Sequence, residues 1–185
     1  SEMCIRDRNR RDYEELQLET SADGILTGFC NINEDEVGED NSHAAAIIYD
    51  YSVLAGSQGF FHHQKLDRIC EKAEEFSLPV VIFTEGGGGR PGDTDVTTQI
   101  AGLHIPSFST WARLTGKCLK IAVNNGYCFA GNAVLFGCSD FMIATKQSWI
   151  GMAGPAMIEG GGLGVYVLLL QSSVSYTHLT LPTTY

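Results

Sequence analysis

The chain has 185 residues, 44% of them hydrophobic, and a formal net charge of −10. This length and composition predict one soluble globular domain with a buried core, without an apolar run of the about 20 residues that cross a bilayer. The acidic balance argues against nucleic acid as a partner.

The acidity is concentrated near the start of the chain. Residues 10–40 carry two positive and ten negative side chains, whereas residues 41–171 carry eight and ten. We therefore expect a solvated acidic front and a nearly neutral remainder that does not strongly repel an anionic substrate. The six cysteines form no Cys-x-x-Cys pair and no zinc spacing, which favours a reduced, cytoplasmic compartment.

Both ends of the chain look foreign to the rest. The stretches "SEMCIRDR" and "VSYTHLTLPTTY" resemble translated sequencing-adapter read-through. We expect residues 1–9 and 172–185 to be artefactual tails, and residues 10–171 to be a truncated domain from a longer chain. The alternative is that both ends are ordinary disordered tails.

The first half of the chain combines strand patterns with one clear helix. Residues 22–33 have glycine at two turn positions between short apolar runs, which predicts a small β-hairpin. Residues 34–40 read as a solvated loop, and residues 43–54 as a buried strand. Residues 62–77 have apolar side chains at helical spacing among many charges, which predicts an amphipathic helix.

The second half alternates strands and helices. Residues 80–84 form a continuous apolar run, which predicts a strand in a sheet covered on both faces. Residues 106–116 read as a helix, residues 119–125 and 140–145 as strands, and residues 148–154 as a further short strand. Strand, turn, helix and strand recurring in this way are typical of βαβ units, and therefore of an α/β fold.

Two glycine-rich turns follow predicted strands. The first reads "EGGGGRPGD" from Glu85, and the second reads "NNGYCFAGNAVLFGCSD", in which Gly131 and Asn132 open a short apolar helix. A helix N-terminus carries unpaired N–H groups that favour negative charge, and glycine lets a ligand carbonyl approach the backbone closely. Two such turns facing one point would form an oxyanion hole.

Four motifs in order carry a family resemblance: "DYSVLAGSQG", "LPVVIFTEGGGGRPGD", "GYCFAGNAVLFGCSD" and "IGMAGPAMIEGGGLG". Together they resemble the carboxyltransferase component of biotin-dependent acyl-CoA carboxylases, in the crotonase superfamily. The similarity covers roughly residues 11–171. It implies an α/β crotonase-like fold of stacked ββα units, whose strands form two roughly perpendicular sheets flanked by helices.

The resemblance also implies a reaction and its partners. The family transfers a carboxyl group from carboxybiotin to the α-carbon of an acyl-CoA, in the manner of acetyl- or propionyl-CoA carboxylases. This chain is similar to the first of two crotonase-like halves, which binds the acyl-CoA. The second half belongs to a partner subunit across a homo-oligomer interface. The biotin cofactor is attached to a biotin carboxyl carrier and loaded by a biotin carboxylase, so we expect the chain alone to be inactive.

The resemblance assigns roles to individual residues. The enolate oxygen would accept hydrogen bonds from the backbone N–H groups of two pairs of residues: Gly88 and Gly89, and Gly131 and Asn132. The substrate-binding residues would come from three places: Leu54, Ala55, Gly56 and Ser57; Arg90; and Ala130. Arg90 would either orient its loop or meet an anionic group of the substrate.

Hydration of a double bond, the reaction of other superfamily members, is disfavoured by the sequence. Hydratases have an acid/base glutamate three positions after the oxyanion glycine, where this chain has Val134. Glu85 or Glu159 would have to substitute for it. Two rivals stay open: an acyl-CoA decarboxylase of the same architecture, which uses the same enolate, and a non-catalytic scaffold subunit of a carboxylase.

Other eye-catching residues have simpler interpretations. No Gly-Lys-Ser/Thr follows the first turn, so it is not a Walker-type phosphate loop. We expect no metal site: His62 and His63 read as a solvated helix start, and Asp93 and Asp95 as turn residues. Cys128 reads as a small buried residue rather than a nucleophile. The glycine cluster at residues 158–164 either lines the cavity near the partner's biotin or is a plain loop.

Overall fold

A five-stranded sheet forms the centre of the molecule, which we describe from a computed structural model over residue 18 and residues 20–90 and 105–154. The strand order is β1-β2-β3-β4-β6. The strands are β1 (Ile25–Asn31), β2 (His43–Tyr49), β3 (Val80–Phe83), β4 (Lys120–Asn124) and β6 (Phe141–Ala144). β1 is antiparallel to β2, and the other neighbours are parallel, so β2, β3, β4 and β6 all end at the same edge.

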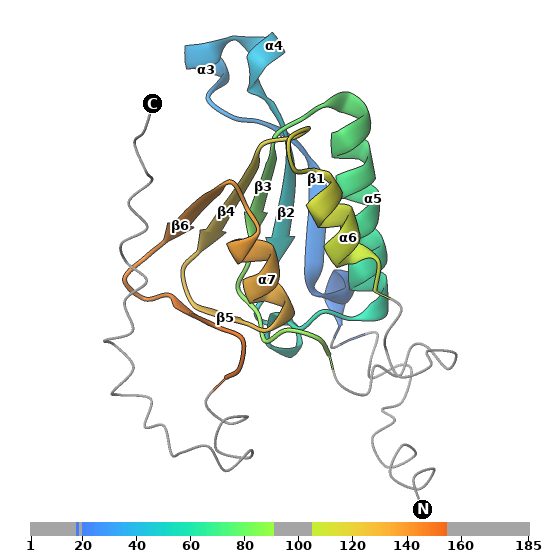
Figure 1. The fold of residues 1–185 in the computed structure, drawn as a ribbon, viewed down its shortest axis with the longest axis vertical. Helices are drawn as coiled ribbons and strands as arrows, with labels where there is room; N and C mark the ends of the chain where they lie inside the picture. Colours follow the sequence, from blue (N-terminus) through green and yellow to red (C-terminus); the bar gives the residue numbers. More distant parts are fainter. Residues whose placement is uncertain (1–17, 19, 91–104, 155–185) are drawn as a thin grey trace, which may run out of the picture.

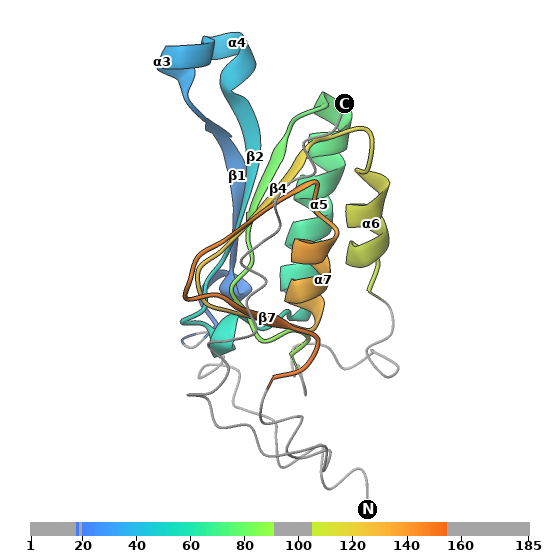
Figure 2. The same ribbon diagram turned by 60° about the vertical axis from the view of Figure 1, so that its left-hand side comes forward.

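Three helices pack on one face of this sheet (Figures 1 and 2). They are α5 (Phe60–Phe76), α6 (Ser107–Arg113) and α7 (Gly131–Gly137). The core lies between sheet and helices and includes Ile47 and Ile82 from the strands and Leu66, Trp111 and Leu135 from the helices. Within the described ranges, no helix is both long enough and apolar enough to span a membrane.

A second, two-stranded parallel sheet crosses the end of the main sheet where β3 and β4 finish (Figure 1). It joins β5 (Tyr127–Phe129) to β7 (Trp149–Gly151). β5 begins three residues after β4 ends, and the sequence pattern did not separate the two strands. The resulting arrangement of two sheets with flanking helices confirms the predicted α/β class.

The region before β2 differs from its prediction. Residues 22–33 do not form a hairpin of their own: they contain a short 3-10 helix, η1 (Ser21–Gly24), and the single strand β1, which pairs with β2. The acidic stretch forms two one-turn helices, α3 (Glu34–Val37) and α4 (Glu39–Ser42), instead of a loop. Its predicted solvation is confirmed, because nearly all of its side chains are exposed.

The second face of the main sheet is also unlike the prediction. An apolar β3 was expected to be covered on both sides, yet Phe83 is 37% exposed and Ile143 on β6 is 53% exposed. Among the described residues, the helices cover only the face that carries Val80 and Ile82. The helix predicted over residues 62–77 is confirmed as α5, which begins two residues earlier because Gly59 precedes it in extended backbone.

Candidate active site

Three connections converge at the carboxyl edge of the parallel strands. β2 leads into the 3-10 turn η2 (Leu54–Gly56), β3 leads into the four glycines, and β4 leads through β5 into α7. Ligand sites of α/β proteins form at this edge, because the loops that follow neighbouring parallel strands meet there. The predicted site residues come from these three connections.

The first glycine turn is almost fully hydrogen-bonded within the protein. Gly86 N–H donates to the Tyr127 carbonyl at 2.7 Å, and Gly87 N–H donates to the Ala55 carbonyl at 2.9 Å. Gly88 N–H donates to Oδ1 of Asn132 at 3.0 Å. Gly88 therefore belongs to the internal framework of the turn, and we remove its N–H from the predicted donors. Gly89 N–H has no hydrogen-bond partner among the described residues, and Gly89 is exposed.

The second turn carries backbone strain just before α7. Ala130, the N-cap residue, has φ 49° and ψ −118°, a conformation that side-chain-bearing residues rarely adopt. Within the described ranges, the N–H groups of Gly131 and Asn132 have no hydrogen-bond partner, as expected for the first positions of a helix. Strain of this kind persists only where the surrounding structure enforces it, and it often marks functional sites.

The two turns lie against each other, although more than forty residues separate them. A Cβ added to Gly88 would lie 2.6 Å from Cβ of Ala130 and 3.4 Å from the backbone nitrogen of Gly131. An isolated parallel bridge joins Gly86 to Cys128, which lies two residues before Ala130. The N–H groups of Gly89 and Gly131, which lack a partner within the described ranges, thus belong to turns that are in contact.

The side chain of Asn132 joins all three connections. It is fully buried, and besides accepting from Gly88 N–H it donates through Nδ2 to the Thr84 carbonyl at 3.2 Å and toward the Gly56 carbonyl at 3.4 Å. The sequence suggested Asn132 for its backbone N–H. Its amide side chain, which fixes the ends of β3 and η2 relative to α7, was missed because nothing local in the sequence signals those partners.

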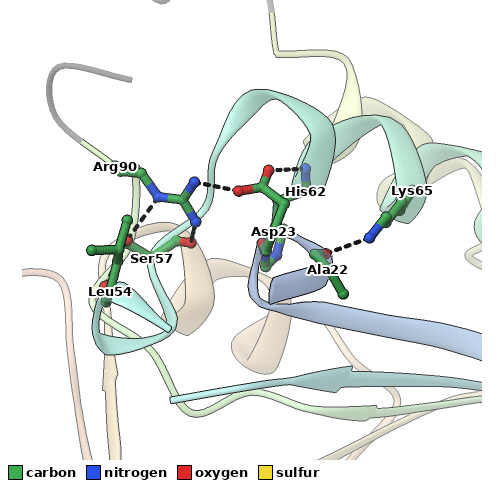
Figure 3. Close-up of polar contacts among 7 residues, drawn as sticks. All are labelled: Ala22, Asp23, Leu54, Ser57, His62, Lys65 and Arg90. Atoms are coloured by element: carbon green, nitrogen blue, oxygen red, sulfur yellow. Dashed lines mark hydrogen bonds and ion pairs between the residues drawn. The ribbon is translucent and has the colours of Figure 1, made fainter. Parts of the chain in front are cut away.

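Arg90 is held by protein groups on both sides of its guanidinium (Figure 3). Nη1 forms an ion pair with Asp23, Nε donates to Ser57 Oγ at 3.2 Å, and Nη2 donates to the Ser57 carbonyl at 3.0 Å. Asp23 in turn accepts from the backbone N–H of His62 at 2.6 Å. Of the two roles predicted for Arg90, these contacts favour orienting the loop over meeting a substrate anion.

The predicted substrate-binding stretch is an unusual run of left-handed backbone. Leu54, Ala55 and Gly56 have φ values of 46°, 56° and 63°. Ser57 Oγ closes the turn by donating to the Leu54 carbonyl at 2.7 Å. Ala55 is exposed while Gly56 and Ser57 are buried, so the turn presents its middle residue at the same edge as Gly89.

The side chains nearby offer little acid–base chemistry. Glu85 Oε1 accepts from the backbone N–H of Asn125 at 2.6 Å, which makes it a cap for the turn between β4 and β5. Burial raises the pKa of the Cys128 thiol to about 12, so this residue is a protonated core side chain at neutral pH. Asp93, Asp95, Glu159 and the third glycine cluster lie outside the described residues.

The prediction that the two adjacent histidines, His62 and His63, are exposed to solvent was wrong. His62 is fully buried and His63 is 8% exposed, because η1 and α6 cover this end of α5. Burial lowers the pKa of His62 to about 3. The residues described contain no cluster of three or more His, Cys, Asp or Glu side chains suited to a metal ion.

Comparisons with known proteins give matches to one family over most of the chain. The family model "Carboxyl transferase domain" matches residues 37–175. A chloroplastic acetyl-coenzyme A carboxylase carboxyl transferase subunit beta from Angiopteris lygodiifolia is 31% identical over 139 residues, which is 74% of this chain and 41% of the relative. The chain spans about half the length of the curated relatives it matches, between 41% and 51% for the first three.

Solved structures give the same result. A single-chain, multi-domain long-chain acyl-CoA carboxylase is 50% identical with a TM-score of 0.77, over 87% of this chain and 16% of that chain. The transcarboxylase 12S hexamer is 26% identical with a TM-score of 0.64, over 78% of this chain and 26% of that chain. The predicted crotonase-like fold is thereby confirmed.

Proposed function

Because this chain belongs to the carboxyl transferase domain family, we propose that it forms the acyl-CoA-binding half of an acyl-CoA carboxylase carboxyltransferase. The observation that carries this proposal is a pair of N–H groups, on Gly89 and Gly131, that have no partner among the described residues and lie in two turns that pack together. The side chain of Asn132 holds the first turn against α7, and the ion pair between Arg90 and Asp23 holds the end of the first turn. The donors are therefore preorganised.

The chemistry needs stabilisation of charge more than a protein acid or base. In the proposed transfer, the bond between the carboxyl carbon and the biotin nitrogen would break, and the α-carbon of the thioester would lose its proton to that nitrogen. The α-carbon would then form a C–C bond to the released carboxyl carbon. Negative charge develops on the thioester oxygen in between. We assign the N–H groups of Gly89, Gly131 and Asn132 to this oxygen. Val134 and the capped Glu85 are consistent with a proton acceptor outside these turns.

We assign coenzyme A and the carboxyl donor to different halves of the carboxyltransferase. We assign the exposed Ala55 turn and Ala130 to contacts with the coenzyme A thioester, and Arg90 to holding the turn. Biotin, as a carboxyl carrier on a partner, would be bound by the second carboxyltransferase half. None of the described side chains is assigned to it.

Substitution of Gly131 tests the oxyanion assignment. In the full-length protein supplied with its biotin carrier, we expect Gly131→Val to lower the transfer rate constant by about 100- to 1000-fold. The valine keeps its N–H, but its side chain would overlap Gln58 Oε1 and crowd Phe108, which moves that N–H out of position. An effect of this size corresponds to losing one donor of an oxyanion hole. The matched control is Gly137→Val, at the other end of α7, where an added Cβ would meet nothing within 4 Å. Transfer of label from carboxylated carrier to acyl-CoA is the measurement.

The same assay separates the rivals. CO2 release from a carboxyacyl-CoA without the carrier would favour an acyl-CoA decarboxylase of this fold. If Gly131→Val retained full transfer activity, the oxyanion assignment would be wrong. A scaffold role would remain if the wild-type protein transferred nothing but still assembled with its carboxylase partners.

A further inference from the structure

Gln58 lies between the two turns and bonds through its main chain to the first. Its N–H donates to the Gly88 carbonyl at 2.7 Å, and its carbonyl accepts from Arg90 N–H at 2.9 Å. These two bonds form a parallel bridge that pairs Gln58 with Gly89. In such a bridge, the residue between the two bonds directs its own N–H away from its partner. Gln58 therefore sets the direction of the Gly89 N–H.

The side chain of Gln58 reaches the second turn. It is 3% exposed, and Nε2 donates to the hydroxyl of Tyr49 at 3.1 Å, which fixes one end of the amide. The other end, Oε1, lies against Gly131: a Cβ added to Gly131 would overlap this oxygen and would lie 3.2 Å from Cζ of Phe108. One residue thus contacts both Gly89 and Gly131, whose N–H groups have no partner in the part of the chain that the structure describes.

Tyr49 is itself held in a closed ring of buried groups. Its ring packs edge-on against His62, with 4.4 Å between centroids. The Nδ1–H of His62 donates to the Asp23 carbonyl at 3.1 Å, and Asp23 forms the ion pair with Arg90. Arg90 then returns to the Gln58 carbonyl through its N–H. The amide of Gln58 therefore has little freedom to rotate or shift.

We propose that Gln58 is a positioning residue, which sets the distance and the direction between the N–H groups of Gly89 and Gly131. This inference rests on the proposed function, since it concerns the same oxyanion donors. Gln58 acts through the two glycines and has no assigned contact with the acyl-CoA. It also explains why the second turn has glycine at position 131, because the amide oxygen occupies the space that a Cβ would need.

The test compares variants of the full-length protein in the carboxyl-transfer assay. We expect Gln58→Ala to lower kcat by about 10- to 100-fold, because displacing a donor by about 1 Å has effects of this size. The KM for acyl-CoA should stay within about twofold, since the affected interaction is made in the transition state. Gln64→Ala, which changes an exposed glutamine on α5, is the matched control and should keep kcat.

A double-variant cycle supplies a readout that a purely structural role would not move. Gly131→Ala alone places its Cβ on Oε1, and we expect it to lower kcat. Adding Gln58→Ala removes the overlap, so the double variant should be no slower than Gly131→Ala, instead of showing the product of the two losses. Gln58→Met, which keeps most of the side-chain volume, replaces Gln58→Ala if the latter does not fold.

Several outcomes would overturn the inference. If Gln58→Ala and Gln58→Met kept wild-type kcat, or raised KM alone, Gln58 would not position the donors. Multiplicative losses in the double variant would likewise count against it. If the wild type transferred no carboxyl group, or Gly131→Val kept full activity, the proposed function would fail first and the inference with it.

Discussion

At the carboxyl end of the main sheet, polar side chains are buried and bonded to one another, whereas the charged side chains of α3 and α4, near its amino end, lie in solvent. Asp23, Gln58 and Asn132 are at most 7% exposed and hold the turns of the candidate site. At the other end, the acidic α3 and α4 make few contacts beyond themselves and β1 (Figure 2). Both regions are rich in polar residues, but the buried side chains of the site hold neighbouring segments together, whereas the carboxylates of α3 and α4 lie in solvent.

The difference has a physical cause. A buried polar group lowers the stability of the fold unless it is fully hydrogen-bonded, so it restricts every partner around it. An exposed carboxylate keeps its water and restricts very little. We therefore expect substitutions of the buried groups at the carboxyl end to have large effects, and equivalent changes of exposed groups at the amino end to have small ones.

The largest expected effect is from Asp23→Ala. Asp23 and Arg90 are each 7% exposed at their side chains, and removing the carboxylate leaves a buried guanidinium without its counter-charge. The expected loss is about 3–5 kcal/mol of the free energy of unfolding, measured by urea denaturation. Glu74→Ala, which removes the exposed ion pairs with Arg113 and Lys117 at the amino end, is the control and should leave the midpoint nearly unchanged. Equal shifts for the two variants would show that the buried ion pair contributes no more to stability than the exposed ones.

The next largest effect on stability is expected from replacing a glycine by alanine at each end of the sheet. Gly56 and Gly116 both have left-handed backbone, with φ 63° and 77°. A Cβ on Gly56 would overlap the Glu85 carbonyl and lie 2.8 Å from Cα of Gly86, whereas one on Gly116 would meet nothing within 4 Å. Both alanine variants lose about 1 kcal/mol to backbone strain, and Gly56→Ala loses about 1–3 kcal/mol more to overpacking. Similar unfolding midpoints in urea would show that Gly56 has more space beside Glu85 and Gly86 than these distances indicate.

The smallest effect, taken per pH unit, is a pH dependence at the carboxyl end. The pKa of His62 is lowered from 6.5 to about 3, first by burial and with smaller contributions from the nearby His63, Arg90 and Lys65. Below pH 6.5 the unfolded chain binds a proton that the folded chain does not, so stability falls as the pH drops from 6.5 toward 3. The slope from this group is at most about 1.4 kcal/mol per pH unit.

Two histidine variants isolate that slope from the carboxylates that titrate in the same range. His62→Leu should flatten the dependence of the unfolding free energy on pH between 6.5 and 4, whereas His43→Asn, at the exposed start of β2, should keep it. An unchanged slope in His62→Leu would mean that another group controls acid sensitivity.

The sequence by itself determined most of the later helices and strands and the identity of the two turns. Apolar periodicity predicted α5, and the apolar run predicted β3, because both depend on neighbours in the chain. The glycines of the two turns were visible for the same reason, and so were the motifs of the family. The strand β5 was missed, since three residues carry too little pattern to separate from β4.

Only the tertiary structure decided which groups are available at the site. Whether Gly88 N–H is free depends on Asn132, and the direction of Gly89 depends on Gln58. Whether Arg90 faces a ligand depends on Asp23, which lies 67 positions away. A hydrogen bond between distant residues leaves no periodic trace in the sequence, because its geometry exists only after the strands have brought their ends together.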